Sequence, residues 1–461
     1  MPHASDPTTA IPPEEAVSLP EASRAAPTAL DNEENRHDPR LVRWNLATLV
    51  FDVSCFSIGM AFLDLSAVLP LMMERLGASG LLIGAFAALR SLTYNGFQVL
   101  VAYATHGRPR QKPFINWALC TTRLPLLLMP FFLWHAADSE SARLAALLAV
   151  VVLMTGWALG DGLVCVPWTE VIARSFSTRT RGRFFTTTQL ISGVVSIAIA
   201  GMIVQHVLNA PHLPYPANYA LLTGVFAIFM QFSLLGVLLI KEPPAPAYTR
   251  TLQHPPLGDY FRRVPALIRA NPTFQRLAII QLLVGFGGAS APFYVLYATR
   301  RFSLGDQWGG LYQVWMAVGL VLLMPLWTFL SERRGPAAAV KGVALGCLLS
   351  PLLALTLGNL SPVLFGLVFL FMGGSLGWGL WIALNHFLLS HIAEEERPIF
   401  VALINLLFTP AALYPFFGGL LVQQKQLVSV AGVPVLFLLT ALVVAVGFAL
   451  ALRLEAPSTE T

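Results

Sequence analysis

Apolar residues occur in long blocks along this chain, and short polar stretches separate the blocks. About 20 residues of helix are needed to cross roughly 30 Å of hydrocarbon, so each block is long enough to span a membrane. The twelve predicted helices run over about 44–73, 79–105, 113–135, 142–172, 184–208, 217–240, 273–299, 306–331, 337–358, 361–391, 397–423 and 432–453.

A polar stretch rich in proline and arginine, 241–272, divides these helices into two groups of six. The expected fold class is therefore all-α integral membrane, with twelve transmembrane helices in two six-helix, pseudo-symmetric halves at 41–240 and 273–455. Residues 1–40 are rich in proline, alanine, serine and acidic side chains. We expect them to form a disordered cytoplasmic tail, and 456–461 to form a short second tail.

An internal repeat supports two related halves. Three glycines and one arginine recur at nearly constant spacing, as Gly156, Gly160, Gly162 and Arg181 in the first half and as Gly373, Gly377, Gly379 and Arg397 in the second. Glycines at such spacings allow helix backbones to approach closely. The repeat therefore predicts close helix packing in both halves.

The composition indicates that the bilayer is the solvent of this chain. Hydrophobic residues make up 56% of the sequence and charged residues only 11%, against about 25% charged residues in soluble domains. The four cysteines lie inside apolar blocks and form no CxxC pair. Neither a metal site nor a disulfide framework is expected.

Lysine and arginine are unevenly divided between the two sides of the predicted membrane. With the N-terminus inside, 21 of the 29 lie on the inner side and five on the outer side. Positive charge accumulates on the cytoplasmic side of membrane proteins. We therefore expect a multi-pass protein of the bacterial inner membrane with both termini cytoplasmic, and this placement accounts for the net charge of +5 without a nucleic-acid partner.

Five charged residues fall inside predicted helices, where each costs about 2.5–3.5 kcal/mol on insertion scales. Asp52, Arg123 and Asp161 are expected at one depth, and Asp64 and Arg90 at another. Three carboxylates against two guanidinium groups leave one carboxylate unmatched. We hypothesise that it exchanges a proton during transport, with Asp64 as the first candidate, followed by Asp52 and Asp161. A static ion-pair network is the alternative.

Polar and aromatic side chains on three helices are expected to line a cavity between the halves. These are Arg90, Tyr94, Gln98, Tyr294, Tyr297, Trp378, Trp381, Asn385 and His386. Their spacing places those of the second helix on one face, and likewise most of those of the tenth. A wall with an arginine and carboxylates opposite an aromatic wall suits a small organic anion, a zwitterion or a polyol. Interior packing is the alternative for the aromatic residues, and a structural hydrogen bond for the histidine.

Three segments, 68–84, 106–113 and 179–184, resemble the major facilitator superfamily. The resemblance covers about 410 residues and implies an alternating-access transporter. It also implies a conformational latch at the basic loops, with the candidates Arg108, Arg110, Glu170, Arg181, Glu332, Arg333 and Arg334. The loop after the second helix lacks the family's usual aspartate, because Ala102 to Thr105 precede His106. The chain is similar to a poorly characterised bacterial branch.

We expect a secondary active transporter that moves a small solute across the membrane by alternating access, with proton coupling. A facilitated-diffusion carrier and a transporter-like sensor or assembly partner without flux remain as alternatives. The sequence contains no phosphate-binding loop GxxxxGK[ST], no HExxH and no GxSxG, so an ATP-driven pump and an enzyme are disfavoured. The expected partners are the lipid bilayer, a small-molecule solute and protons; we expect a monomer without cofactor.

Overall fold

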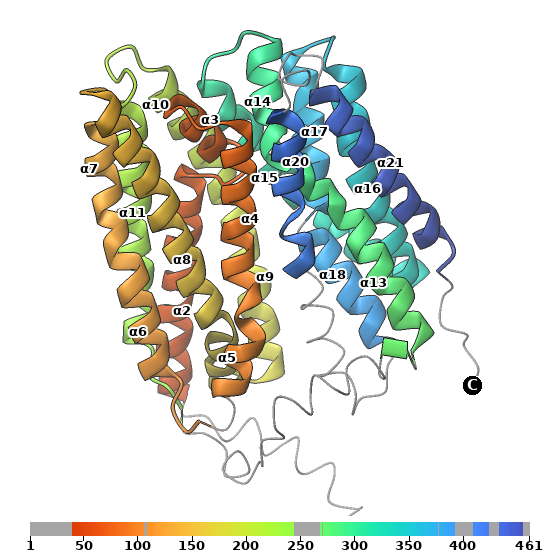
Figure 1. Ribbon diagram of the computed structural model, residues 1–461. Coiled ribbons are helices and arrows are strands. Elements are labelled where there is room, and N and C mark those ends of the chain that lie inside the picture. The colour runs from red at the N-terminus through yellow and green to blue at the C-terminus, as the bar shows by residue number, and fades with distance from the viewer. Residues whose placement is uncertain are drawn as a thin grey trace, which may run out of the picture.

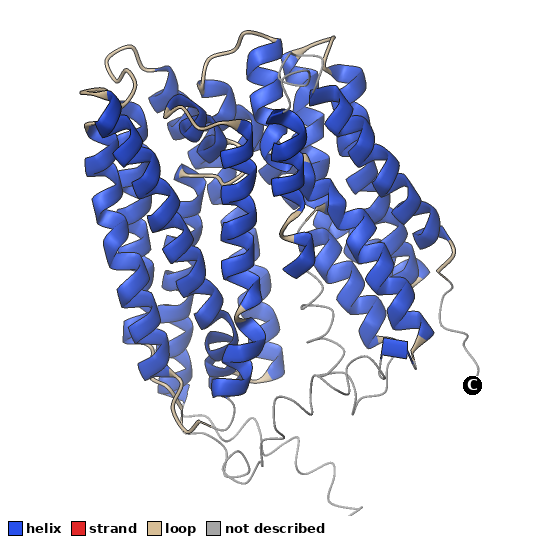
Figure 2. Ribbon diagram, viewed as in Figure 1, coloured by secondary structure: helices blue, strands red, loops and turns tan. Residues whose placement is uncertain are grey.

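The computed structural model describes residues 39–105, 108–243, 268–269, 271–376, 378–391, 409–423 and 433–454. Over these ranges the regular structure is helical and contains no strand (Figure 2). Almost all of the predicted N-terminal tail, most of the 241–272 linker and the C-terminal tail lie outside the described residues.

The first half of the chain, called the N-terminal half, comprises the elements up to Leu239. They are α2 (Pro39–Phe62), α3 (Val68–Arg75), α4 (Gly80–Gly96), α5 (Gln98–Thr105), α6 (Lys112–Arg123), η2 (Leu124–Leu128), α7 (Met129–Trp134), α8 (Glu140–Ser175), α9 (Thr178–Ile199), η3 (Ala200–Val204), α10 (Gln205–Asn209) and α11 (Ala217–Leu239).

The second half, called the C-terminal half, begins at Pro272. Its elements are α13 (Pro272–Gly285), η5 (Phe286–Ala289), α14 (Ala291–Arg301), α15 (Gln307–Arg334), α16 (Pro336–Leu357), α17 (Pro362–Ser375), α18 (Trp378–Leu389), α20 (Tyr414–Gln423) and α21 (Val433–Leu452).

Ten helical stretches within the described ranges are long and apolar enough to cross a membrane. The predicted second helix forms as α4 and α5, which only Phe97 separates, and the predicted eleventh is described in part as α20. The all-α membrane fold is confirmed, while the count of twelve spans stays a prediction.

The prediction for the first helix is wrong at its C-terminal end. It stops at Phe62, and a turn precedes α3. The Asp64 carboxylate oxygen Oδ1 accepts the backbone N–H groups of Ser66 at 2.8 Å and Ala67 at 2.7 Å. A side chain that accepts hydrogen bonds from the backbone N–H groups of the next few residues stabilises a turn in competition with the helix.

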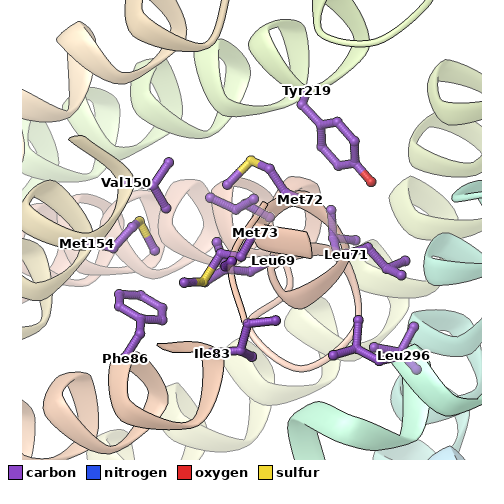
Figure 3. Close-up of a cluster of buried hydrophobic side chains, with 14 of the residues drawn as sticks. Leu69, Leu71, Met72, Met73, Ile83, Phe86, Val150, Met154, Tyr219 and Leu296 are labelled. Carbon is purple, nitrogen blue, oxygen red and sulfur yellow. The ribbon is translucent and has the colours of Figure 1, made fainter. Parts of the chain in front are cut away.

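The two halves lie side by side in Figure 1 and differ at their two ends. We call the end with the turns 63–67, 302–306 and 358–361 the closed end, and the end with 108–111, 176–177 and 390–391 the open end. At the closed end one apolar core contains residues of both halves; Figure 3 shows Leu296 of α14 beside Ile83 of α4. Toward the open end each half has a separate core, around Leu49 in one and Phe274 in the other.

Helices α4 and α20 pack closely against each other across the two halves. A Cβ added at Gly84 would clash with the carbonyl oxygen of Pro415, and one added at Gly80 would lie 3.0 Å from Val422. Gly419 approaches the backbone of α4 in the same way. Only glycine permits the two backbones to pack at this distance, so the closed end depends on these positions.

Candidate functional site

A buried network of polar side chains ties four helices of the N-terminal half together. Arg123 of α6 donates two hydrogen bonds to Asp161 Oδ1 of α8, from Nη2 at 2.9 Å and from Nε at 3.2 Å. Its Nη1 donates to Ser233 Oγ of α11 at 2.7 Å. Ser233 in turn donates to Asp52 Oδ1 of α2 at 2.5 Å, and Trp168 Nε1 donates to Asp52 Oδ2 at 3.3 Å.

This network confirms that Asp52, Arg123 and Asp161 share one layer. The ion pair joins Arg123 to Asp161, so Asp52 is held by neutral donors alone among the described residues. Within this network, Asp52 is therefore the carboxylate that lacks a direct guanidinium partner.

Asp64, the first proton-exchange candidate, has a structural task in this conformation. Its Oδ1 caps the turn after α2, as described above. The described residues show no ion pair between Asp64 and Arg90 within 4 Å, although their charges interact at longer range. The structure therefore does not join these two side chains into the pair that their depth suggested.

Arg90 and Tyr94 lie one turn apart on α4, and Gln98 follows at the start of α5. The Arg90 side chain is partly buried, and its guanidinium makes no hydrogen bond or ion pair within the ranges that the structure describes. Tyr94 directs its hydroxyl to Cys165 Sγ at 4.0 Å, and Gln98 Nε2 donates to the Tyr94 carbonyl at 3.1 Å. The Arg90 guanidinium thus has no partner in these ranges, while Tyr94 and Gln98 already make contacts of their own.

Trp378 and Trp381 form an aromatic surface on α18. Their side chains are 55% and 37% exposed, and their rings meet edge to face with centroids 5.9 Å apart. Asn385 is buried and donates from Nδ2 to the Trp381 carbonyl at 2.8 Å. In Figure 1, α18 runs along the side of the C-terminal half that faces the N-terminal half.

His386 lies on a different part of the α18 surface from Trp378, and its side chain is exposed. It lines a small space between α15, α16 and α18 together with Trp327 and Ser331. On a helix with 3.6 residues per turn, His386 lies about 80° further around than Trp378. The prediction that His386 faces the cavity together with Trp378 and Trp381 stays a prediction.

Tyr294 and Tyr297 lie inside the closed-end core, 1% and 6% exposed. The Tyr294 ring packs on Phe437 with centroids 4.8 Å apart, and Tyr297 packs on the same ring and on Phe365. Helix α14 is buried because it packs against α3 and α17 where the halves meet. In this conformation the two tyrosines therefore line no open surface, contrary to the expectation from the sequence.

Glycine contacts fix the depth of Arg90 relative to the other half. One turn and a half nearer the closed end, Gly84 of α4 packs on Gly419. Nearer the open end, a Cβ added at Gly96 would lie 3.9 Å from Thr409 Cγ2. Arg90 is therefore level with a segment between Thr409 and Gly419.

The same level contains two helix interruptions of the C-terminal half. Gly285 ends α13 beside Ala411 and Tyr414, and η5 follows. A Cβ added at Gly287 would lie 3.3 Å from Leu376, which lies in the break between α17 and α18. Both interruptions thus fall in the layer of Arg90, and Trp378 starts α18 at that level.

Charged residues join the two halves at the closed end. Arg75 of α3 donates to Asp306 at 2.9 Å, and Arg300 of α14 pairs with Glu74. Tyr219 of α11 adds a hydrogen bond to Asp306 Oδ2 at 3.0 Å. The hydrogen bond and attraction from Asp306 raise the pKa of Arg75, so this arginine stays charged. We call these pairs the closed-end ion pairs.

The closed-end ion pairs were not predicted from the sequence. The available signal was the adjacent Glu74 and Arg75 after the first apolar block, opposite Arg300 and Asp306 at the corresponding place in the second half. Gln313 Nε2 also donates across the halves, to the buried carbonyl of Ala61 at 2.8 Å.

The latch candidates at the open end divide into two groups. Arg108, Arg110, Glu332, Arg333 and Arg334 have exposed side chains. Arg333 lies over the Phe329 ring at 5.3 Å, and no ion pair joins these five residues to a partner in the described ranges. The side chain of Arg181 lies outside the description.

Glu170 belongs to a cluster that holds the N-terminal half together at its open end. It accepts from Arg174 Nε at 2.9 Å, and Arg174 Nη1 also reaches Glu242 at 3.4 Å. Glu242 accepts the backbone N–H groups of Gln111 at 2.7 Å and Lys112 at 3.0 Å, so it caps α6 from the end of α11. Arg174 and Glu242 were not recognised from the sequence.

All four cysteines are free thiols, and the described residues contain no cluster that could hold a metal ion.

Comparison with known proteins gives a consistent result. A family profile described as the Major Facilitator Superfamily matches residues 50–414. Comparison of the sequence with curated proteins gives no significant match.

Solved structures show the same fold at low sequence identity. A mutant of the nucleoside transporter NupG superposes with a TM-score of 0.64 at 14% identity, covering 88% of this chain and 100% of the other. A D-xylose–proton symporter gives 0.64 at 13%, covering 90% and 98%. A bacterial homologue of the lysosomal transporter Spinster, inward-facing and unoccupied, gives 0.59 at 15%, covering 90% and 97%.

Proposed function

The chain belongs to the major facilitator superfamily. We propose that it moves a small solute across the membrane by alternating access, with the solute site between the halves 41–240 and 273–455. One observation carries the proposal: the halves share a core at the closed end and have separate cores toward the open end. A carrier in one of its two states has this asymmetry, because a solute path must be shut on one side while it is accessible from the other.

The open end faces the cytoplasm in this proposal. Arginines and lysines of the helix ends and loops concentrate there, with examples in Arg108, Arg110, Arg174 and Arg334, as the positive-inside rule requires. The structure then represents the state open to the cytoplasm of a bacterial inner-membrane protein, and the closed-end ion pairs seal the outer side.

Proton coupling is assigned to the Asp52 network. Asp52 lacks a direct guanidinium partner, while Arg123 is shared between Asp161 and Ser233. Burial favours the neutral form of a carboxyl group and a nearby arginine favours the charged form. A small movement of Arg123 toward Asp52 would therefore release a proton, and a movement away would favour uptake. Asp64 is a weaker candidate because the backbone occupies one of its oxygens.

Transport is tested in proteoliposomes with labelled amino acids, sugars, carboxylates and nucleosides, under an imposed pH gradient. We expect one class to accumulate, and Asp52→Asn to permit only downhill equilibration of that class. A short bis-maleimide joining Arg75→Cys to Asp306→Cys in a cysteine-free background should abolish flux, while either single cysteine with the same reagent retains it.

The alternatives give different results in the same assay. Flux that survives the cross-link would contradict alternating access. Solute binding without flux in the uncross-linked protein would instead indicate a sensor. Equilibration without accumulation in the wild type would indicate a facilitated-diffusion carrier.

A further inference from the structure

We propose that the solute is a small organic anion with a flat, apolar ring, held between Arg90 of α4 and the Trp378–Trp381 surface of α18. This inference rests on the proposed transport function, since it names the substrate class of the site between the halves. Three features of the molecule support it: the unmatched charge of Arg90, the layer that Arg90 shares with the start of α18, and the aromatic surface.

The two arginines inside the N-terminal half differ in their contacts. Arg123 uses three of its nitrogens on Asp161 and Ser233. Arg90 is also at mid-helix and partly buried, but its guanidinium has no hydrogen-bond acceptor among the described residues. The Arg90 side chain as a whole is partly exposed rather than fully enclosed. A guanidinium presents five donors in a planar fork that matches a carboxylate or similar oxyanion.

The start of α18, on the other half, lies at the same depth as Arg90. Contacts of Gly84 and Gly96 place Arg90 level with the start of α20, and contacts of Gly285 and Gly287 continue that level to Leu376. Trp378 follows two residues later at the first position of α18. The positive end of a helix dipole therefore adds to the positive charge of Arg90 in this layer. Interrupted helices at mid-membrane are typical of substrate sites in transporters.

Trp378 and Trp381 lie at the start of α18 and are 55% and 37% exposed. Among the described elements, helix α18 makes its main contacts with α13, α15, α16 and α17, all in its own half. Exposed indole faces bind flat rings by stacking or edge contact. They also bind cations, but Arg90 and the α18 dipole repel a cation at this level.

A matched set of four probes tests this combination by thermal unfolding of the full-length protein in detergent. Benzenesulfonate carries the anion and the ring, benzenesulfonamide the ring without charge, methanesulfonate the anion without the ring, and phenyltrimethylammonium the ring with opposite charge. Benzoate serves as a second aromatic oxyanion. A ligand that binds only the folded state raises the unfolding temperature, and the rise grows with the logarithm of the ligand concentration relative to its Kd.

We expect an aromatic oxyanion to stabilise the wild type and the other three probe types to do so at least about tenfold more weakly. Arg90→Gln should weaken aromatic-oxyanion binding by about 10- to 100-fold, and Arg90→Lys should restore part of it. Trp378→Ala should remove the preference for the ring. Arg143→Gln, which alters an exposed arginine at the closed end, is the control and should bind as the wild type does.

Two results would overturn the inference: stabilisation by neither aromatic oxyanion at millimolar concentration, or stabilisation that Arg90→Gln leaves unchanged. Counterflow of benzenesulfonate in proteoliposomes separates this inference from the proposed function. Binding that depends on Arg90 without any flux would leave the site and refute transport. Flux of a neutral or cationic solute that ignores Arg90 would leave transport and refute the anion site.

Discussion

The polar contacts within one half differ in kind from those between the halves. Arg123 and Asp161 are only 6% and 10% exposed, and Ser233 extends their ion pair to Asp52. Of the closed-end ion pairs, in contrast, the two arginines are 53% and 50% exposed. Buried pairs are costly to break, whereas exposed pairs contribute little and re-form easily.

This difference fits the two kinds of contact that alternating access requires. Contacts within a half must survive each cycle, and contacts between halves must be broken in each cycle. The same contrast appears at the open end, where Glu242 caps α6 within the N-terminal half while Arg108, Arg110 and Glu332 have no ion-pair partner in the described ranges. The charges at the open end are thus available for the opposite state.

The largest effect is expected from breaking the buried network. Arg123→Gln leaves Asp161 without its cation, and removing one partner of a buried ion pair costs about 3–5 kcal/mol. Unfolding in a titration of sodium dodecyl sulfate should require much less detergent than in the wild type. Arg453→Gln, at an exposed position near the end of α21, is the matched control. An unchanged transition in Arg123→Gln would show that the network does not hold the half together.

A medium effect is expected where the backbones of α4 and α20 meet. Gly84→Ala introduces a methyl group that clashes with the carbonyl of Pro415, and overpacking of this kind costs about 1–3 kcal/mol. The cost falls on the closed end alone, so the halves should separate there without general unfolding. Gly156→Ala is the control, because nothing lies within 4 Å of the added carbon. Equal behaviour of the two variants would mean that the contact at Gly84 is not needed for closure.

A smaller effect is expected from the cap at the open end. Glu242→Gln keeps one acceptor for the start of α6 but loses the charge that faces Arg174. Loss of a helix cap costs about 0.5–2 kcal/mol, so a modest fall in the unfolding temperature is expected, with conformational exchange unchanged. A large shift between the two conformations would show that Glu242 acts between the halves as well.

The smallest effect on stability is expected from the closed-end ion pairs. Asp306→Asn removes the ion pair with Arg75 and weakens the Tyr219 hydrogen bond, at a cost of about 0.2–1 kcal/mol. The unfolding temperature should stay within error while the closed end opens more often. In the other closed-end ion pair, Glu74→Arg combined with Arg300→Glu exchanges the two charges and recreates the pair. This double variant should keep the wild-type balance between the open and closed states of the closed end. Failure of the exchange would point to a steric rather than an electrostatic role.

The sequence predicted the membrane helices well because apolar length is a strong and local signal. It also placed Asp52, Arg123 and Asp161 in one layer, since helix rise converts position into depth. It could not predict the turn at Asp64, where a side-chain contact with the next backbone groups ends α2 early.

The site was predicted less completely than the fold, for reasons of geometry. Helical spacing selected Arg90 and the α18 tryptophans, but it could not show that Tyr294 is enclosed by the ring of Phe437. That contact joins segments far apart in the chain. Likewise, pairs such as Arg75 with Asp306 depend on how the two halves meet, which no periodicity within one helix encodes.

The most direct test of alternating access is a pair of distance measurements between spin labels in a cysteine-free background. Ala137→Cys with Leu360→Cys reports on the closed end, and Pro109→Cys with Ser390→Cys reports on the open end; all four positions are exposed. Gly84→Ala is predicted to lengthen the first distance and shorten the second in the same molecules. A change at one end with none at the other, or changes of the same sign at both ends, would contradict the account.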